Sequence, residues 1–201
     1  MKQIIIVLTL LIGLPLAQAQ ERLSQEQALR LAKLVGADAN QLKGTPIPTS
    51  VDLEKPVALR DGEFGGLVLP EAKLSAEGLA QAGEKVVAIG QLWLRGLTPV
   101  RDGQGVSEAK LRIATVKTKD GEEVKVPQCA LGVRRVAGGE LELLVFGKDK
   151  EPLLKVALKK IDAKQESPLE MDAERGDESA QVSLKILGKY EAKFKVTQLE
   201  L

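Results

Sequence analysis

The sequence predicts a mainly β protein: an antiparallel β-sandwich, with a closed β-barrel as the second choice. Side chains alternate between apolar and polar from Val57 to the C-terminus, which is the period of half-buried strands. The pairs Asp120-Gly121 and Gly138-Gly139 interrupt this alternation with residues typical of hairpin turns. A helical pattern and a proline-containing linker precede the strands. The predicted parts are a signal peptide (1–19), an amphipathic helix (20–36), a linker (37–56) and an antiparallel β domain (57–201).

Residues 1–19 have the composition of a secretory signal peptide. Lys2 supplies a positive charge, residues 4–16 form an apolar run, and Ala17-Gln18-Ala19 has the small-x-small pattern of a signal peptidase site. The run is shorter than the roughly 20 residues that a membrane helix needs. We therefore predict cleavage before Gln20, export to the periplasm or the extracellular space, and no integral membrane segment after cleavage. The alternative is a short anchor that stays uncleaved.

The next residues carry start and stop signals of a helix. Ser24 with Gln27 three residues later fits a capping box, and Leu23 with Ala28 is spaced for a hydrophobic staple. Gly36 fits the position after a helix, where the backbone often adopts the left-handed conformation. We therefore predict one short helix within residues 20–36.

One side of this helix is apolar and needs a surface to cover it. The stripe consists of Ala28, Leu31, Leu34 and Val35. We expect it to dock on its own domain, and a groove on a partner protein is the alternative. Residues 37–56 contain three prolines without a steady period, and we interpret them as the linker.

The turn residues fix a predicted register for two hairpins. Asp120-Gly121 as a two-residue turn sets Lys117 opposite Val124, and Thr115 opposite Val126, so that Ile113 and Val124 share a face. A turn at Gly138-Gly139 sets Val136 opposite Leu141 and Arg135 opposite Glu142. The strand at 152–161 has a charged side, which includes Lys155 and Lys159 and would resist pairing with another molecule if this strand lies at a sheet edge.

The C-terminal hairpin can be placed by burial. A two-residue turn at Gly188 would set Leu184 against Lys193, whereas a three-residue loop at 188–190 sets it opposite Phe194. Because a slip of one residue moves every side chain to the other face, we predict the second arrangement, with apolar side chains of both strands on one face.

The tripeptide Arg175-Gly176-Asp177 matches a known adhesion sequence and lies among carboxylates. We interpret it as a hairpin turn, because it separates an extended run ending near Met171 from a strand that begins near Ala180. A cation site is the alternative, although the carboxylates do not follow EF-hand spacing. The carboxylates are Asp172, Glu174, Asp177 and Glu178.

The segment 86–97 is the most apolar part of the chain after the signal, and we predict a central strand buried on both faces. It contains Trp93, which is either a core residue or the stacking platform of a ligand site. Ser75 is predicted to start a short helical turn just before this strand.

Several residue types needed for catalysis are absent or scarce. The chain has no histidine and one cysteine, Cys129, which we expect to be buried, with a reactive or intermolecular role as the alternative. The glycine clusters lack phosphate-loop spacing, so we expect no cofactor. Without Lys2 the chain has 28 basic and 28 acidic side chains, and it has few aromatic ones, so we expect no nucleic-acid partner.

These observations favour a non-catalytic exported module that acts through protein contacts, with another envelope protein as its partner. The predicted docking element is the helix, through Leu31, Leu34 and Val35, or an exposed sheet edge. The alternative is a carrier of an apolar small molecule or lipid near Trp93. A hydrolase built on carboxylates is the third hypothesis.

Overall fold

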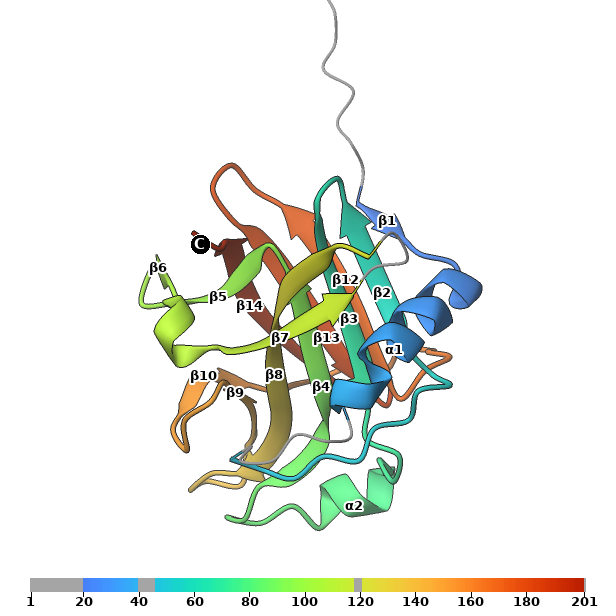
Figure 1. Ribbon diagram of the computed structural model, residues 1–201. Coiled ribbons are helices and arrows are strands. Elements are labelled where there is room, and N and C mark those ends of the chain that lie inside the picture. The colour runs from blue at the N-terminus through green and yellow to red at the C-terminus, as the bar shows by residue number, and fades with distance from the viewer. Residues whose placement is uncertain (1–19, 40–45, 118–120, 201) are drawn as a thin grey trace, which may run out of the picture.

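The computed structural model describes residues 20–39, 46–117 and 121–200. Its strands form two antiparallel sheets (Figure 1). The first sheet consists, in spatial order, of β1 (Glu21–Arg22), β2 (Val57–Asp61), β3 (Phe64–Pro70), β4 (Val87–Arg95), β8 (Glu123–Arg135), β9 (Leu141–Phe146) and β10 (Pro152–Ala157), with β7 (Arg112–Lys117) paired to β8. The predicted signal peptide lies outside the described residues.

The second sheet is built mainly from the C-terminal strands. It consists of β12 (Leu169–Arg175), β13 (Ala180–Ile186), β14 (Tyr190–Gln198), β5 (Leu97–Arg101) and β6 (Gln104–Gly105), with β11 (Lys159–Lys160) paired to β14. All pairings between the described strands are antiparallel, and both sheets are open. The mainly β, antiparallel prediction is therefore confirmed, and the closed barrel is wrong.

The largest core cluster lies between the two sheets. Leu92 and Leu94 of β4 enter it from the first sheet, and Val182, Leu184 and Phe194 enter it from the second. Successive residues of a strand point to opposite faces, so β4 also sends side chains to the outer face of the first sheet. β4 lies between β3 and β8, as predicted for the central strand.

Helix α1 (Gln25–Ala39) covers part of that outer face (Figure 1). Its predicted capping box is present: the Ser24 N–H donates to Gln27 Oε1 at 2.9 Å, and the Gln27 N–H donates to Ser24 Oγ at 3.3 Å. The prediction that Gly36 ends the helix is wrong, because the helix continues to Ala39. A Cβ at Gly36 would lie 2.9 Å from Leu53 Cδ1, so glycine at this position permits the close contact between Leu53 and the helix.

Residues 46–56, the described part of the predicted linker, pack against the domain. Ile47 and Val51 are buried, and Val51 forms a bridge with Glu71. The Ser50 N–H donates to a carboxylate oxygen of Glu71 at 2.7 Å, and the Ala72 N–H donates to the Ser50 carbonyl at 2.8 Å. This stretch is therefore packed chain and not a free tether.

A second short helix, α2 (Ala76–Ala80), and the 3-10 turn η1 (Glu108–Lys110) complete the described elements. Ser75 caps α2 as predicted, because its Oγ accepts from the Gly78 N–H at 3.1 Å. Within the described residues, neither α-helix has the length and apolar character that crossing a bilayer requires.

Two predicted hairpin registers are wrong by one residue. Val116, not Lys117, pairs with Val124, and Ala114 pairs with Val126. Val116, Ala114 and Val126 pack in the cluster under α1. Ile113 instead packs on the core between the sheets. The outer face of the first sheet is also buried, under α1. Burial of apolar side chains on this second face favours the observed register.

The β8–β9 hairpin shows the same shift. Arg134, not Arg135, lies opposite Glu142, with its Nε 2.6 Å from Glu142 Oε1. Arg135 instead donates to the carbonyls of Ala82 and Gly139. The loop has three residues because Gly138 and Gly139 both adopt positive φ and the Val136 N–H bonds to the Glu140 carbonyl.

The C-terminal hairpin has the predicted face but a different pairing. Leu184 lies opposite Ala192, and Val182 lies opposite Phe194. The loop is centred on Gly188, whose φ is +65°. Strand β10 lies at an edge of the first sheet, because it pairs only with β9 among the described strands, while Lys159 pairs across to the second sheet.

Candidate functional site

Trp93 lies in the core between α1 and the first sheet, with 2% of its surface exposed. Its indole N–H donates to Gln91 Oε1 at 3.1 Å. The amide nitrogen of Gln91 donates to the Ala39 carbonyl at 2.8 Å and to Thr49 Oγ1 at 2.7 Å. The pair therefore fastens the end of α1 and the chain near Thr49 to the sheet, and Trp93 has no surface for stacking a ligand.

The structure separates the predicted docking residues of α1. Val35 is 6% exposed and packs on the sheet together with Ala28, Ala32 and Ala39. Leu31 and Leu34 are 36% and 39% exposed, and they are the large apolar side chains that stand exposed among the described residues. The single stripe predicted from the sequence is thus wrong: the alanine side of the helix docks, and the two leucines face away from the core.

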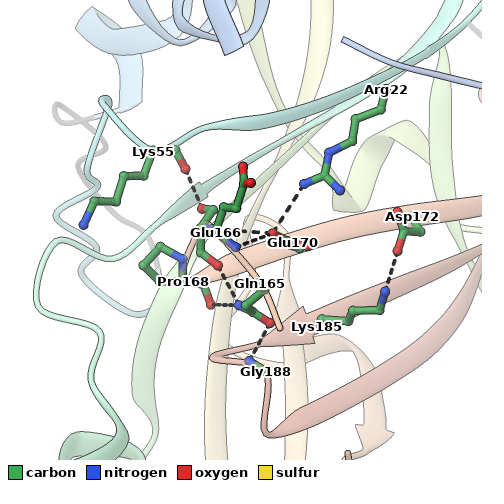
Figure 2. Close-up of polar contacts among 10 residues, drawn as sticks. Arg22, Lys55, Gln165, Glu166, Pro168, Glu170, Asp172, Lys185 and Gly188 are labelled. Carbon is green, nitrogen blue, oxygen red and sulfur yellow. Dashed lines mark hydrogen bonds and ion pairs between the residues drawn. The ribbon is translucent and has the colours of Figure 1, made fainter. Parts of the chain in front are cut away.

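A polar network joins the start of β12 to the N-terminal segment (Figure 2). The buried carboxylate of Glu170 accepts from the Glu166 N–H at 2.8 Å and lies 3.5 Å from Arg22 Nη2. Ser167 Oγ donates to the Lys55 carbonyl at 2.8 Å. Because these groups are paired with one another, Glu170 serves as an anchor for the chain rather than as an acid or base facing a cleft.

Gln165 extends this network to the β13–β14 loop. Its amide nitrogen donates to the carbonyls of Ser167 and Pro168 at 2.6 and 3.0 Å, and its Oε1 accepts from the Gly188 N–H (Figure 2). Nearby, Lys185 Nζ lies 2.8 Å from Asp172 Oδ2, and this hydrogen bond raises the pKa of Lys185. The Gln165 contacts join the segment before β12 to the β13–β14 loop, and the Lys185–Asp172 contact joins β13 to β12.

The Arg175-Gly176-Asp177 tripeptide is part of a hairpin turn, as predicted. Arg175 ends β12 opposite Ala180, and the Gly176 N–H bonds to the Ser179 carbonyl at 2.8 Å. Strand β12 extends four residues beyond Met171, the end predicted from the sequence. Within the described residues, no group of three or more Asp, Glu or Cys side chains is arranged to hold a metal ion.

Cys129 is fully buried in the core between the sheets and forms no disulfide. Burial raises the pKa of its thiol to about 12. A protonated thiol without solvent access is a poor nucleophile. Burial also raises the pKa of Glu71, whose carboxylate accepts the Ser50 N–H.

A cleft of about 190 Å³ opens between the sheets beside the 176–179 turn. Its floor is aliphatic, with contributions from Leu59, Leu94, Leu97, Met171, Val182 and Val196. Arg175 lies at the rim, with Nη1 3.4 Å from both carboxylate oxygens of Asp61. A Cβ at Gly66 would lie 2.8 Å from Met171 Cε, so a side chain at this position would displace the Met171 methyl group, which lines the cleft. Trp93 does not line the cleft.

A larger groove, of about 730 Å³, lies between β10 and β14. Residues 152–157 of β10 form one wall, residues 193–195 of β14 form the other, and residues 100–103, at the end of β5 and in the β5–β6 turn, close one end. We name it the β10–β14 groove. Its lining holds four cations, Arg101, Lys155, Lys193 and Lys195, and one carboxylate, Asp102.

The sequence pattern signalled only one wall of this groove. The strand with a charged side that the sequence indicates at 152–161 contains β10, which lies at the edge of the first sheet. The opposite wall depends on a gap in the pairing of β14, which no local pattern predicts. Comparisons with protein-family models, with curated proteins and with solved structures found no match to the chain.

Proposed function

We propose that the chain is a non-catalytic, exported β-sandwich module that acts through contact with another protein of the cell envelope. Two antiparallel sheets that share one core support the sandwich architecture. The signal-like composition of residues 1–19 supports export to the periplasm or the extracellular space.

One observation carries the protein-contact proposal: the β10–β14 groove is bordered by strand edges that lack a partner. β10 pairs with β9 alone, and Ala192–Lys195 of β14 have no strand on the side that faces the groove, among the described residues. Unpaired backbone groups on a strand edge bind extended peptides in many recognition domains. The groove is also larger than the aliphatic cleft.

The placement of the reactive residue types supports a non-catalytic role. The sequence has no histidine, and its single thiol is buried and held protonated. Glu170, the most buried of the described carboxylates, is engaged by two backbone N–H groups and by Arg22. Neither the groove nor the cleft includes it.

Site-specific photo-crosslinking in cells that export the chain tests this function. A photoreactive amino acid at Lys155, on the groove wall, is expected to give one recurrent protein adduct. The same amino acid at Lys150, on the exposed β9–β10 turn outside the groove, is the matched control and is expected to give none. The same amino acid at a third position, Leu31, tests whether helix α1 is the docking element. Absence of adducts at Lys155 and Leu31, or equal adducts at all three positions, contradicts the proposal.

The aliphatic cleft supports a second candidate function, the binding of a small apolar molecule. At about 190 Å³ it is smaller than the roughly 300–1,000 Å³ of pockets for drug-sized ligands, and so it suits a small ring or a short chain better than a lipid. Titration with toluene, followed by the methyl NMR signal of Met171, tests it. Saturable shifts that the Gly66→Ala variant loses support this function. The absence of shifts contradicts it.

A further inference from the structure

The pairing of β14 is interrupted on one side. On its other side, β13 pairs with residues 190–196. On the groove side, β11 pairs with Tyr190 and Glu191, and β5 pairs with residues 196–198. The four residues Ala192–Lys195 between them have no strand partner there in the described part of the chain. In this gap the edge of β14 has no strand pairing.

The strands next to the gap indicate how a segment would enter it. Both β11 and β5 run antiparallel to β14, so a segment that continues their line would also pair antiparallel to β14. The gap fixes its length in the sheet at about four residues, since each residue of an added strand faces one residue of β14. β10 forms the opposite wall of the groove at this level.

The charges of the groove indicate which segment fits. Among the described residues, no carboxylate lies within ion-pair distance of Lys155 or Lys195, and Lys193 has only a long contact of 3.8 Å with Glu191. Opposite charges on neighbouring antiparallel strands are favourable, and like charges are unfavourable. A second copy of this chain, entering with the lysine-bearing edge of β10, would place lysine against lysine. An acidic segment of another protein is complementary.

The side chains of β14 alternate within the gap. Lys193 and Lys195 are exposed, whereas Phe194 is 6% exposed and belongs to the core between the sheets. A strand paired to β14 would therefore meet lysines on its outer face and apolar side chains on its inner face. The complementary sequence alternates acidic and apolar residues.

We propose that the β10–β14 groove binds an extended segment of a partner protein, with alternating acidic and apolar residues, which adds to the second sheet as a strand antiparallel to β14. This inference rests on the proposed protein-contact function and specifies the chemistry of its partner. Affinity would come from backbone hydrogen bonds to β14, and selectivity from the groove cations.

Fluorescence anisotropy with the mature chain tests this inference. The probe is a labelled hexapeptide of sequence Glu-Val-Glu-Val-Glu-Val, and the charge control is its lysine counterpart. Two further peptides keep the acidic sequence but carry N-methyl groups on alternate backbone amides. One peptide is methylated at the odd-numbered residues and the other at the even-numbered residues. We expect the acidic peptide to bind roughly tenfold more tightly than the lysine peptide, since it makes two or three favourable charge pairs with the groove lysines where the lysine peptide makes unfavourable ones. At least one N-methylated peptide should lose binding.

Matched charge reversals locate the binding site. Lys193→Glu with Lys195→Glu should weaken binding of the acidic peptide, whereas Lys148→Glu with Lys150→Glu, the same charge change outside the groove, should leave it nearly unchanged. Circular dichroism confirms that both variants fold. Equal binding of acidic and lysine peptides overturns the inference, as does undiminished binding of both N-methylated peptides or equal loss in both double variants. If any of these overturning results is obtained while Lys155 still gives specific crosslinks, this inference fails and the protein-contact function stands.

Discussion

Trp93 donates its indole N–H to the side-chain oxygen of Gln91, two residues earlier on the same strand, and both side chains are buried under α1. Residues i and i+2 of a strand share one face, which brings the two groups within 3.1 Å. The same Gln91 amide holds Ala39 and Thr49. The most conspicuous aromatic residue of the sequence therefore has a structural role in joining the helix to the sheet.

Replacement of Trp93 tests that role. Trp93→Phe keeps an aromatic ring but leaves Gln91 Oε1 buried without a donor, which costs about 1–3 kcal/mol of unfolding free energy. Trp93→Ala should cost about 3–5 kcal/mol. Urea unfolding followed by circular dichroism measures both. A loss below about 0.5 kcal/mol for Trp93→Ala would be typical of a surface residue and would contradict the buried position.

The two sides of α1 should differ in their effect on stability. Leu31→Ser and Leu34→Ser remove exposed side chains and should change the unfolding free energy by no more than about 0.5 kcal/mol. Val35→Ala, on the docked side, should cost about 2 kcal/mol because it removes buried methyl groups. Thermal and urea unfolding of the three variants give the comparison. A larger loss for the leucines than for Val35 would reverse the assigned orientation of the helix.

Cys129 should resist thiol reagents in the native protein. Its pKa of about 12 lies above the ordinary value of 9.0, so the unfolded chain releases this proton first as the pH rises. The contribution of the protonated thiol to stability is complete below pH 9 and is lost between pH 9 and about 12. Labelling with a chromogenic disulfide should proceed only as urea unfolds the protein. Rapid stoichiometric labelling in native buffer would show that the thiol is accessible.

Glu71 should make the free energy of unfolding depend on pH in the acid range. Burial raises its pKa above the ordinary 4.5, so its protonated form favours folding below that value and the benefit is lost as the pH rises through the raised pKa. Glu71→Gln keeps an acceptor for the Ser50 N–H without a charge. The variant should be more stable than the parent at pH 7, and the difference should disappear near pH 3.5.

The control for this prediction is Glu63→Gln, which makes the same change on an exposed turn. Unfolding free energies of the parent and both variants at pH 7 and pH 3.5 make the comparison. A parent that is more stable than Glu71→Gln at pH 7 would contradict the direction of the pKa shift.

The sequence was sufficient for the order and type of most elements. The capping box at Ser24, the central strand around Trp93 and the turn at Gly176 all depend on local chemistry, and the structure confirms each of them. Local signals of this kind do not require knowledge of which segments meet in space.

The errors came from contacts between distant segments. The two predicted registers rest on two-residue turns at Asp120-Gly121 and Gly138-Gly139, but α1 and the chain near Ile47 bury the outer face of the first sheet as well as its inner face. This second face favours the pairing of Val116 with Val124. The β10–β14 groove has the same origin, because it exists only where β5 and β11 leave part of β14 unpaired.

Amide hydrogen exchange along β14, with and without the acidic hexapeptide, tests the central claim most directly. The account predicts that backbone amides within Ala192–Lys195 that face the groove gain protection when the peptide binds. Amides of β12, the opposite edge of the second sheet, serve as the internal control and should not change. Unchanged exchange at 192–195, or protection that appears at β12 instead, would contradict strand addition at this gap.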